Sequence, residues 1–179
     1  MKTTLLSCFF LLLPMAMCAQ EEAQPAVADT TEQAFTEHIL FEGIEVKGDI
    51  YTFQHELEHH GFKLIKRMAD AEQFAMRGTI AGCTCDFVIS YSHETRTVYR
   101  IMARPKRVNI PAYLDSLKVR YGEPYDYEDE TYKWLLPNGM VMFKTPASYD
   151  PTLLLLDALG VKAYKEEEDS ARVRMPNNG

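Results

Sequence analysis

The sequence predicts an α+β fold: an antiparallel sheet with two helices packed on one face and the other face open. Three observations lead to this prediction. Segments with strand-like alternation follow one another across short turns, two helical segments carry their own start and stop signals, and single helices separate the runs of strands. The 179 residues are 46% hydrophobic and 25% charged, which suits one globular core rather than a disordered chain.

Composition divides the chain into four parts. We expect a signal peptide at 1–19, a flexible acidic leader at 20–38, a single α+β domain at 39–160 and a charged tail at 161–179. The domain then holds about 120 residues, a common size for one core.

Residues 1–19 have the pattern of an export signal. Lys2 precedes an apolar run that is too short to span a membrane and that ends in small residues. Cleavage after Cys18, cleavage after Ala19 and lipidation of Cys18, as in bacterial lipoproteins, all remain open. We expect an exported protein, periplasmic or secreted, with a lipid anchor at Cys18 as the alternative.

The domain is expected to open with a strand at 39–46 and a helix at 50–60. Asp49 has the short acceptor side chain of a helix N-cap, and Gly61 ends the helix. A short strand is expected next, at 62–65.

Three further strands, at 72–80, 83–91 and 95–104, are expected to form an antiparallel meander because only short turns separate them. Side chains alternate between the two faces of a strand, so the apolar members should share the core face. In the last two strands these are Cys83, Cys85, Phe87, Ile89, Tyr91, Tyr99, Ile101 and Ala103.

A second helix should begin after Asn109 and end at Gly122. Asn109 is a favourable N-cap, Pro111 suits the first turn, and glycine is the usual terminator. Its apolar stripe at helical spacing consists of Tyr113, Leu114, Leu117 and Tyr121.

A hairpin follows the second helix. Strands at 131–136 and 140–145 flank Pro137-Asn138-Gly139, a strong turn signal. Four consecutive leucines, Leu153 to Leu156, favour a buried strand beside this hairpin, although the flanking Asp150-Pro151 and Gly160 also suit a helix.

The segment HELEH at 55–59 matches the zinc-binding pattern in which two histidines one helical turn apart hold the metal and a glutamate activates water. Its members are His55, Glu56 and His59. At 100° per residue the two histidines fall about 200° and 240° from Phe53, away from the apolar stripe. We therefore interpret the segment as a solvated helix face, and a zinc site remains the alternative.

Cys83 and Cys85 are the cysteines left after the signal peptide. Positions i and i+2 of a strand point to the same face, and their parallel Cβ vectors do not favour a disulfide. Packing in the core is the simplest role, with thiol redox or metal chemistry as the alternative.

An arginine stripe marks the predicted open face. Arg96, Arg100 and Arg104 alternate along the third strand of the meander, and Arg77 takes the same face of the first. This local positive charge suits an acidic partner. The net charge of −7 argues against nucleic acid, and the sequence indicates no phosphate-binding loop and no platform of aromatic side chains for stacking.

The chain resembles a family of small secreted proteins of Bacteroidetes-type Gram-negative bacteria. The resemblance lies in FEGIEVKGDIYTFQHELEHHGF, FAMRGTIAGCTCDFVI, LKVRYGEP and KWLLPNGMVMF. It implies no catalytic residues. The order of elements is also similar to that of β-lactamase-inhibitor-like folds, in which a helix-backed sheet offers its open face to another protein.

These observations favour an exported, non-enzymatic binding domain of the cell envelope. The expected binding residues are Arg77, Arg96, Arg100 and Arg104, the expected partner is an acidic envelope protein or another envelope component, and no cofactor is expected. The alternatives are a zinc-dependent hydrolase built on HELEH and a redox role for the two thiols.

Overall fold

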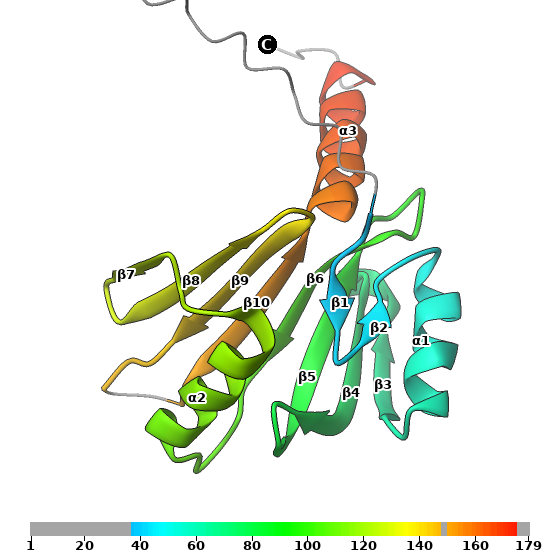
Figure 1. Ribbon diagram of the computed structural model, residues 1–179. Helices are drawn as coiled ribbons and strands as arrows, with labels where there is room; N and C mark the ends of the chain where they lie inside the picture. The colour runs from blue at the N-terminus through cyan, green and yellow to red at the C-terminus, as the bar shows by residue number, and fades with distance from the viewer. Residues whose placement is uncertain (1–36, 148–149, 175–179) are drawn as a thin grey trace, which may run out of the picture. The chain divides into compact units, whose positions relative to one another are not determined.

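The computed structural model describes residues 37–147 and 150–174 (Figure 1). The expected signal peptide at 1–19, with Cys18, and all but the last two residues of the expected leader lie outside the described residues. The α+β prediction is confirmed, because a large antiparallel sheet packs against helices. The described part holds three helices rather than the two expected.

Eight strands form one sheet in the order β3-β4-β5-β6-β10-β9-β8-β7, with every neighbouring pair antiparallel. The strands are β3 (Lys63–Met68), β4 (Gln73–Ile80), β5 (Cys83–Tyr91), β6 (Val98–Ala103), β7 (Asp126–Glu128), β8 (Thr131–Leu136), β9 (Gly139–Lys144) and β10 (Thr152–Asp157).

The order of elements repeats once along the chain. Helix α1 (Ile50–His59) precedes the meander β3 to β6, and α2 (Ile110–Tyr121) precedes the meander β7 to β10. The two meanders meet where β6 pairs with β10. Outward from that pair, each meander runs in reverse chain order, from β6 to β3 on one side and from β10 to β7 on the other. The sequence shows no repeat that would have announced this arrangement.

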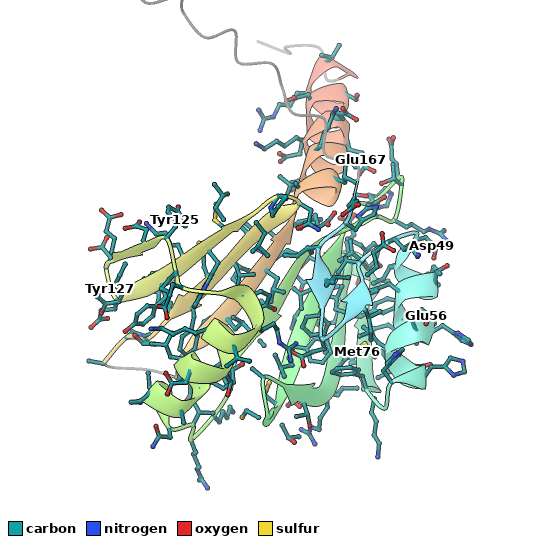
Figure 2. The ribbon with its side chains drawn as sticks, in the orientation of Figure 1. Asp49, Glu56, Met76, Tyr125, Tyr127 and Glu167 are labelled. Atoms are coloured by element: carbon teal, nitrogen blue, oxygen red, sulfur yellow. The ribbon has the colours of Figure 1, made fainter. Side chains whose placement is uncertain are left out.

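Both predicted helices form where their caps place them. The Asp49 carboxylate accepts hydrogen bonds from the backbone N–H groups of Tyr51 (2.8 Å) and Thr52 (3.2 Å), which satisfies donors at the start of α1 (Figure 2). The Asn109 side chain accepts from the backbone N–H of Ala112 (3.1 Å), and Gly122, with φ of +82°, ends α2.

The core lies between the sheet and a layer formed by α1, α2 and a small hairpin (Figure 1). Alternation places one residue from each of six adjacent strands in a continuous row across its inner face, and each is at most 2% exposed. The row consists of Phe74, Ile89, Ile101, Leu155, Val141 and Trp134.

The expected first strand at 39–46 is instead a tight hairpin of two short strands, β1 (Leu40–Phe41) and β2 (Ile44–Glu45). The chain reverses at Glu42 and Gly43, both with positive φ, and glycine tolerates that conformation without strain. Phe41 enters the core and its ring lies 5.2 Å from that of Phe87.

The four leucines form a strand, as favoured. Strand β10 pairs with β6 on one side and with β9 on the other, so Leu153 and Leu155 face the core while Leu154 and Leu156 face the opposite side. Strand β7 was not predicted, because its three residues are too few to show alternation.

The alternation predicted for the third strand of the meander is wrong at its beginning. The register of β5 against β6 shifts between Ser90 and Tyr91, which pair with Arg100 and Val98 and leave Tyr99 as the extra residue. Val98, not Tyr99, is therefore buried in the core. The Tyr99 ring instead stacks on that of Tyr164, with 4.4 Å between centroids.

Tyr164 belongs to helix α3 (Ala158–Arg174), which crosses the expected domain boundary at residue 160. Residues 161–174, expected as a charged tail, form an ordered helix that packs against β6. Gly160 makes the contact, because a Cβ there would lie 1.9 Å from the Val98 carbonyl oxygen. Glu167 accepts hydrogen bonds from the backbone N–H groups of Thr95 (2.8 Å) and Glu94 (3.1 Å), which fixes the helix to the β5–β6 turn (Figure 2).

The start of α3 is also joined to the first described residues. The buried Asp157 carboxylate accepts from the backbone N–H of Gly160 (2.8 Å) and of Ile39 (2.8 Å), and one of its oxygens lies 2.9 Å from His38 Nδ1. One carboxylate thus caps α3 and holds the chain entering the domain.

We expect Gly160→Ala to lower the free energy of unfolding by about 2 kcal/mol, because the added methyl group must push α3 away from β6. Urea unfolding measures the change. Ser170→Ala, in the exposed part of the same helix, is the control and should leave the midpoint nearly unchanged. An unaltered midpoint for Gly160→Ala would show that α3 does not pack on β6.

The anchoring of α3 should depend on pH through Glu167. Burial raises the pKa of this carboxyl, but the hydrogen bonds from the Thr95 and Glu94 backbone and from the Ser92 and Thr95 side chains together lower it more, and the net pKa lies below the ordinary 4.5. The stabilisation is therefore complete above pH 4.5 and disappears as the pH falls through the lowered pKa.

Hydrogen exchange at the Thr95 amide tests this pH dependence. At neutral pH, Glu167→Gln should exchange faster there than the wild type, whereas Glu166→Gln, at an exposed neighbour, should not. Once the pH is below the lowered pKa, wild type and Glu167→Gln should exchange alike. A difference that persists in acid contradicts the assignment.

Candidate functional site

The face of the eight-stranded sheet opposite α1 and α2, here called the outer face, carries an unusual number of apolar side chains. Register places five of them side by side on adjacent strands, and all are half-buried. This apolar row consists of Ala75, Val88, Met102, Leu154 and Met142. A solvated sheet face usually carries polar residues at these positions, so a contiguous apolar row makes this face a candidate interaction surface.

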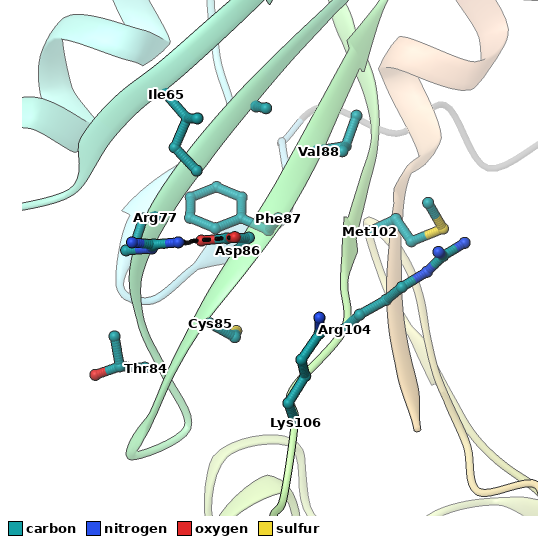
Figure 3. A pocket seen from close by; sticks show the side chains of 11 residues that line it. Ile65, Arg77, Thr84, Cys85, Asp86, Phe87, Val88, Met102, Arg104 and Lys106 are labelled. Carbon is teal, nitrogen blue, oxygen red and sulfur yellow. Dashed lines mark hydrogen bonds and ion pairs between the residues drawn. The ribbon is translucent and has the colours of Figure 1, made fainter. Parts of the chain in front are cut away.

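Positive charge borders the apolar row near the ends of β4 to β6. A hollow of about 710 Å³ lies here, and Ile65, Val88 and Met102 are among its apolar lining residues (Figure 3). Arg104 and Lys106 line it together with Arg77 and Asp86. Arg104 makes no ion pair with any residue the structure describes.

Arg77 and Asp86 neutralise each other on this surface. The guanidinium donates two hydrogen bonds to the carboxylate, at 2.6 and 3.0 Å, across the β4–β5 register pair (Figure 3). The Arg77 guanidinium therefore lowers the pKa of Asp86 and keeps it ionised. Both side chains are largely exposed, so the pair contributes little to stability and leaves Arg104 and Lys106 as the net charge of the hollow.

The far end of the outer face differs in charge. Lys133 Nζ donates to Asp126 (2.9 Å) and to Glu128 (3.0 Å), and the two carboxylates raise the pKa of the lysine. Strands β7 and β8 thus offer a neutral to acidic surface, in contrast with the basic end at β4 to β6.

The four arginines predicted for the open face do not lie together. Arg77 and Arg104 are on the outer face, as expected. Arg96 is not: it precedes β6 with φ of +55°, and its guanidinium carbon lies 5.4 Å from the centre of the Tyr51 ring of α1. The predicted stripe is wrong at this position. Strand β6 begins only at Val98 and its register shifts there, so the alternation does not extend back to Arg96.

Arg100 is on the outer face but serves the fold. It donates to the buried Ser90 hydroxyl from Nε (3.3 Å) and from a terminal nitrogen (3.1 Å), and its guanidinium lies over the Tyr99 ring. With these contacts it is less available to a partner than Arg104.

The histidines of HELEH are exposed on α1, on the side away from the core, as the helical spacing predicts. The rings of His55 and His59 lie 4.5 Å apart, while Phe53 and Leu57 are buried. Among residues 37–147 and 150–174, no group of three or more histidine, cysteine, aspartate or glutamate side chains is placed to hold a metal ion. The two imidazoles have no third protein ligand in the part of the chain that is described.

Cys83 and Cys85 are free thiols on the inner side of β5. Burial raises the pKa of the Cys85 thiol to about 12, so hardly any of it is thiolate at neutral pH. For Cys85 this environment favours the packing role, because nucleophilic and redox chemistry require an accessible thiolate.

The apolar row was not predicted from the sequence. Its members occupy the strand positions between the core residues. Val88 lies between Phe87 and Ile89, and Leu154 lies between two buried leucines. Hydrophobic residues at every position of a strand indicate burial on both faces, or an exposed apolar face. Only the position of the helices in the structure distinguishes a strand buried on both faces from one with an exposed apolar face.

Comparison with known proteins identifies no relative. No family model matches the chain, no curated protein matches it, and no solved structure matches it. In the described residues, none of the helices is long and apolar enough to cross a membrane. The function is therefore inferred from the chemistry of the outer face.

We expect the Cys85 thiol of the native protein to react with iodoacetamide roughly a thousandfold more slowly than an ordinary cysteine, because a pKa of about 12 in place of 9.0 removes most of the thiolate. Peptide mass spectrometry of Cys83→Ser protein at pH 8 measures Cys85 alone. Reaction in urea is the control and should be fast. Rapid labelling of native Cys85 would reopen the redox alternative.

Proposed function

We propose that this protein is an exported, non-enzymatic binding domain whose outer face docks an acidic protein of the cell envelope. The observation that carries the proposal is the apolar row with Arg104 and Lys106 at its border. A partner that covers the row removes apolar surface from water, while its carboxylates meet the two cations.

The size of the surface suits a protein segment. The apolar row crosses five strands, which corresponds to roughly 19 Å between its ends. Met102 and Met142 lie within it, and methionine side chains adapt to irregular partner surfaces. The row would supply most of the affinity and the neighbouring charges the orientation.

Charge supports an acidic partner rather than a basic or polyanionic one. The chain has a net charge of −7, so the cations at the hollow are a local exception. They would direct the carboxylates of an acidic partner to this part of the surface. Nucleic acid would meet an overall repulsive field, because binding it requires many cations that neutralise phosphates.

Export is supported by the sequence of residues 1–19, with the lipid anchor at Cys18 as its alternative form. The two enzymatic alternatives draw less support, because the described residues give His55 and His59 no third ligand and hold Cys85 as a buried thiol.

Site-specific photo-crosslinking in the envelope of the host cell tests the proposal. A benzophenone amino acid at Met102 should capture an acidic protein, whereas the same group at Tyr51, exposed on the helix side, should not. Arg104→Glu/Lys106→Glu should weaken the purified complex by about tenfold or more and reduce its dependence on salt.

Lys162→Glu/Arg172→Glu is the matched control. It makes the same change of charge at exposed positions of α3 and should leave affinity unchanged. Equal capture at Met102 and Tyr51, or an affinity indifferent to charge reversal at the hollow, would refute docking on the outer face.

A further inference from the structure

His55 and His59 form a pair of exposed imidazoles on α1 that docking on the outer face does not use. They stand one helical turn apart, at positions i and i+4, and their ring centres lie 4.5 Å from each other. Helix α1 packs on the β3 side of the sheet, on the face opposite the outer face (Figure 1). We call His55 and His59 the imidazole pair.

The backbone that carries the imidazole pair is fixed by the core. Asp49 caps the start of α1, and Phe53 and Leu57 on its inner side are at most 1% exposed. The two histidines lie on the opposite side of the helix, about 40° apart around its axis. The helix therefore presents both imidazoles together, and binding an ion requires no change in the backbone.

The spacing of the imidazole pair suits chelation of one metal ion. Imidazole nitrogens bind zinc at about 2.0–2.1 Å, so two nitrogens on one tetrahedral ion stand roughly 3.3 Å apart. Rings whose centres lie 4.5 Å apart can place one nitrogen each at that separation, because the nitrogens lie at the ring edges. Side-chain rotation is then the only movement that chelation requires.

Neighbouring side chains leave the imidazole pair accessible. His60, the next residue along the chain, is held elsewhere, because its Nδ1 donates to the Glu56 carbonyl oxygen (2.9 Å). The Glu58 carboxylate accepts from Gln54 Nε2 (2.7 Å), and Gln54 is buried against the sheet side of α1. Within the described ranges, neither imidazole of the pair is hydrogen-bonded or ion-paired to another side chain, so their nitrogens can bind an ion.

The charges around the imidazole pair are of both signs and do not select the ion. Glu56 and Glu58 flank the pair on α1, and Lys47 interacts with Glu56. The guanidiniums of Arg67 and Arg96 stand beside the first turn of the same helix. Selection comes instead from the nitrogen donors, which suit transition metals, whereas Mg²⁺ and Ca²⁺ prefer oxygen ligands.

We propose that the imidazole pair binds one divalent transition-metal ion that prefers nitrogen ligands, Zn²⁺ or Ni²⁺. The two histidines fill two coordination positions. The described residues supply no third ligand, so the remaining positions are open to water or to a donor group of another molecule.

This site is distinct both from the outer face and from the hydrolase alternative. It lies on the helix side of the sheet, so a variant of the imidazole pair leaves Arg104 and Lys106 untouched. It involves no catalytic step and gives Glu56 no role as a base. The sequence already contained the signal, because spacing of four residues on a capped helix places both imidazoles on one side.

Isothermal titration of the untagged full chain with Ni²⁺, Zn²⁺ and Mg²⁺ tests the proposal. Ni²⁺ and Zn²⁺ should bind with one ion per chain, and Mg²⁺ should not bind. His55→Gln and His59→Gln should each weaken binding by about tenfold or more, because either change leaves a single imidazole and removes the chelate. The double variant should be only a little weaker than either single variant.

His60→Gln/His93→Gln is the matched control, because it removes two exposed histidines outside the pair and should retain the affinity. Zn²⁺ should also raise the urea midpoint of the wild type but not of His55→Gln/His59→Gln, since the chelate exists only in the folded helix.

Failure of both Ni²⁺ and Zn²⁺ to bind would overturn the proposal, and so would equal weakening by the control variant, which would show adventitious binding by exposed histidines. A stoichiometry of one ion per two chains would overturn the open site in favour of one shared between two copies.

Discussion

The pairing of β6 with β10 is the interaction on which the rest of the structure depends. It joins two meanders that are far apart in the chain, through Leu153 to Leu156 against Arg100 to Ala103. Without it each helix-and-meander half would present an open edge and only half a core. With it, Ile101 and Leu155 complete the buried row on one face, and Met102 and Leu154 complete the apolar row on the other.

The same pairing explains why the outer face of the sheet carries apolar side chains. Central strands carry apolar residues on both sides, and the two helices and the β1–β2 hairpin cover only one of them. The other side retains a band of hydrophobic surface between a basic end and an acidic end. The core and the outer face thus draw on alternate residues of the same strands, so Met102 or Leu154 can change without removing a core side chain.

Local signals in the sequence predicted most of the fold. Asp49 and Asn109 marked both helix starts, and alternation placed Phe87 and Ile89 in the core, because each of these depends on a few neighbouring residues. The shifted register accompanies a contact between Tyr99 and Tyr164, sixty-five positions away, and local alternation could not predict it. Of the arginines expected on the open face, Arg104 lies on the outer face, whereas Arg96 turns to α1, and the apolar row was not predicted.

Asp157 joins the start of the described domain to its last strand and last helix. It binds the backbone of Ile39 at the point where the chain enters the described domain, and the same carboxylate caps α3 at the end of the central strand β10. Any tension transmitted from the preceding residues, as in a tethered protein, reaches this carboxylate and the buried Phe41 before it reaches the sheet. The force would then act along β10, which is hydrogen-bonded to β6 on one side and to β9 on the other, so two neighbouring strands resist it.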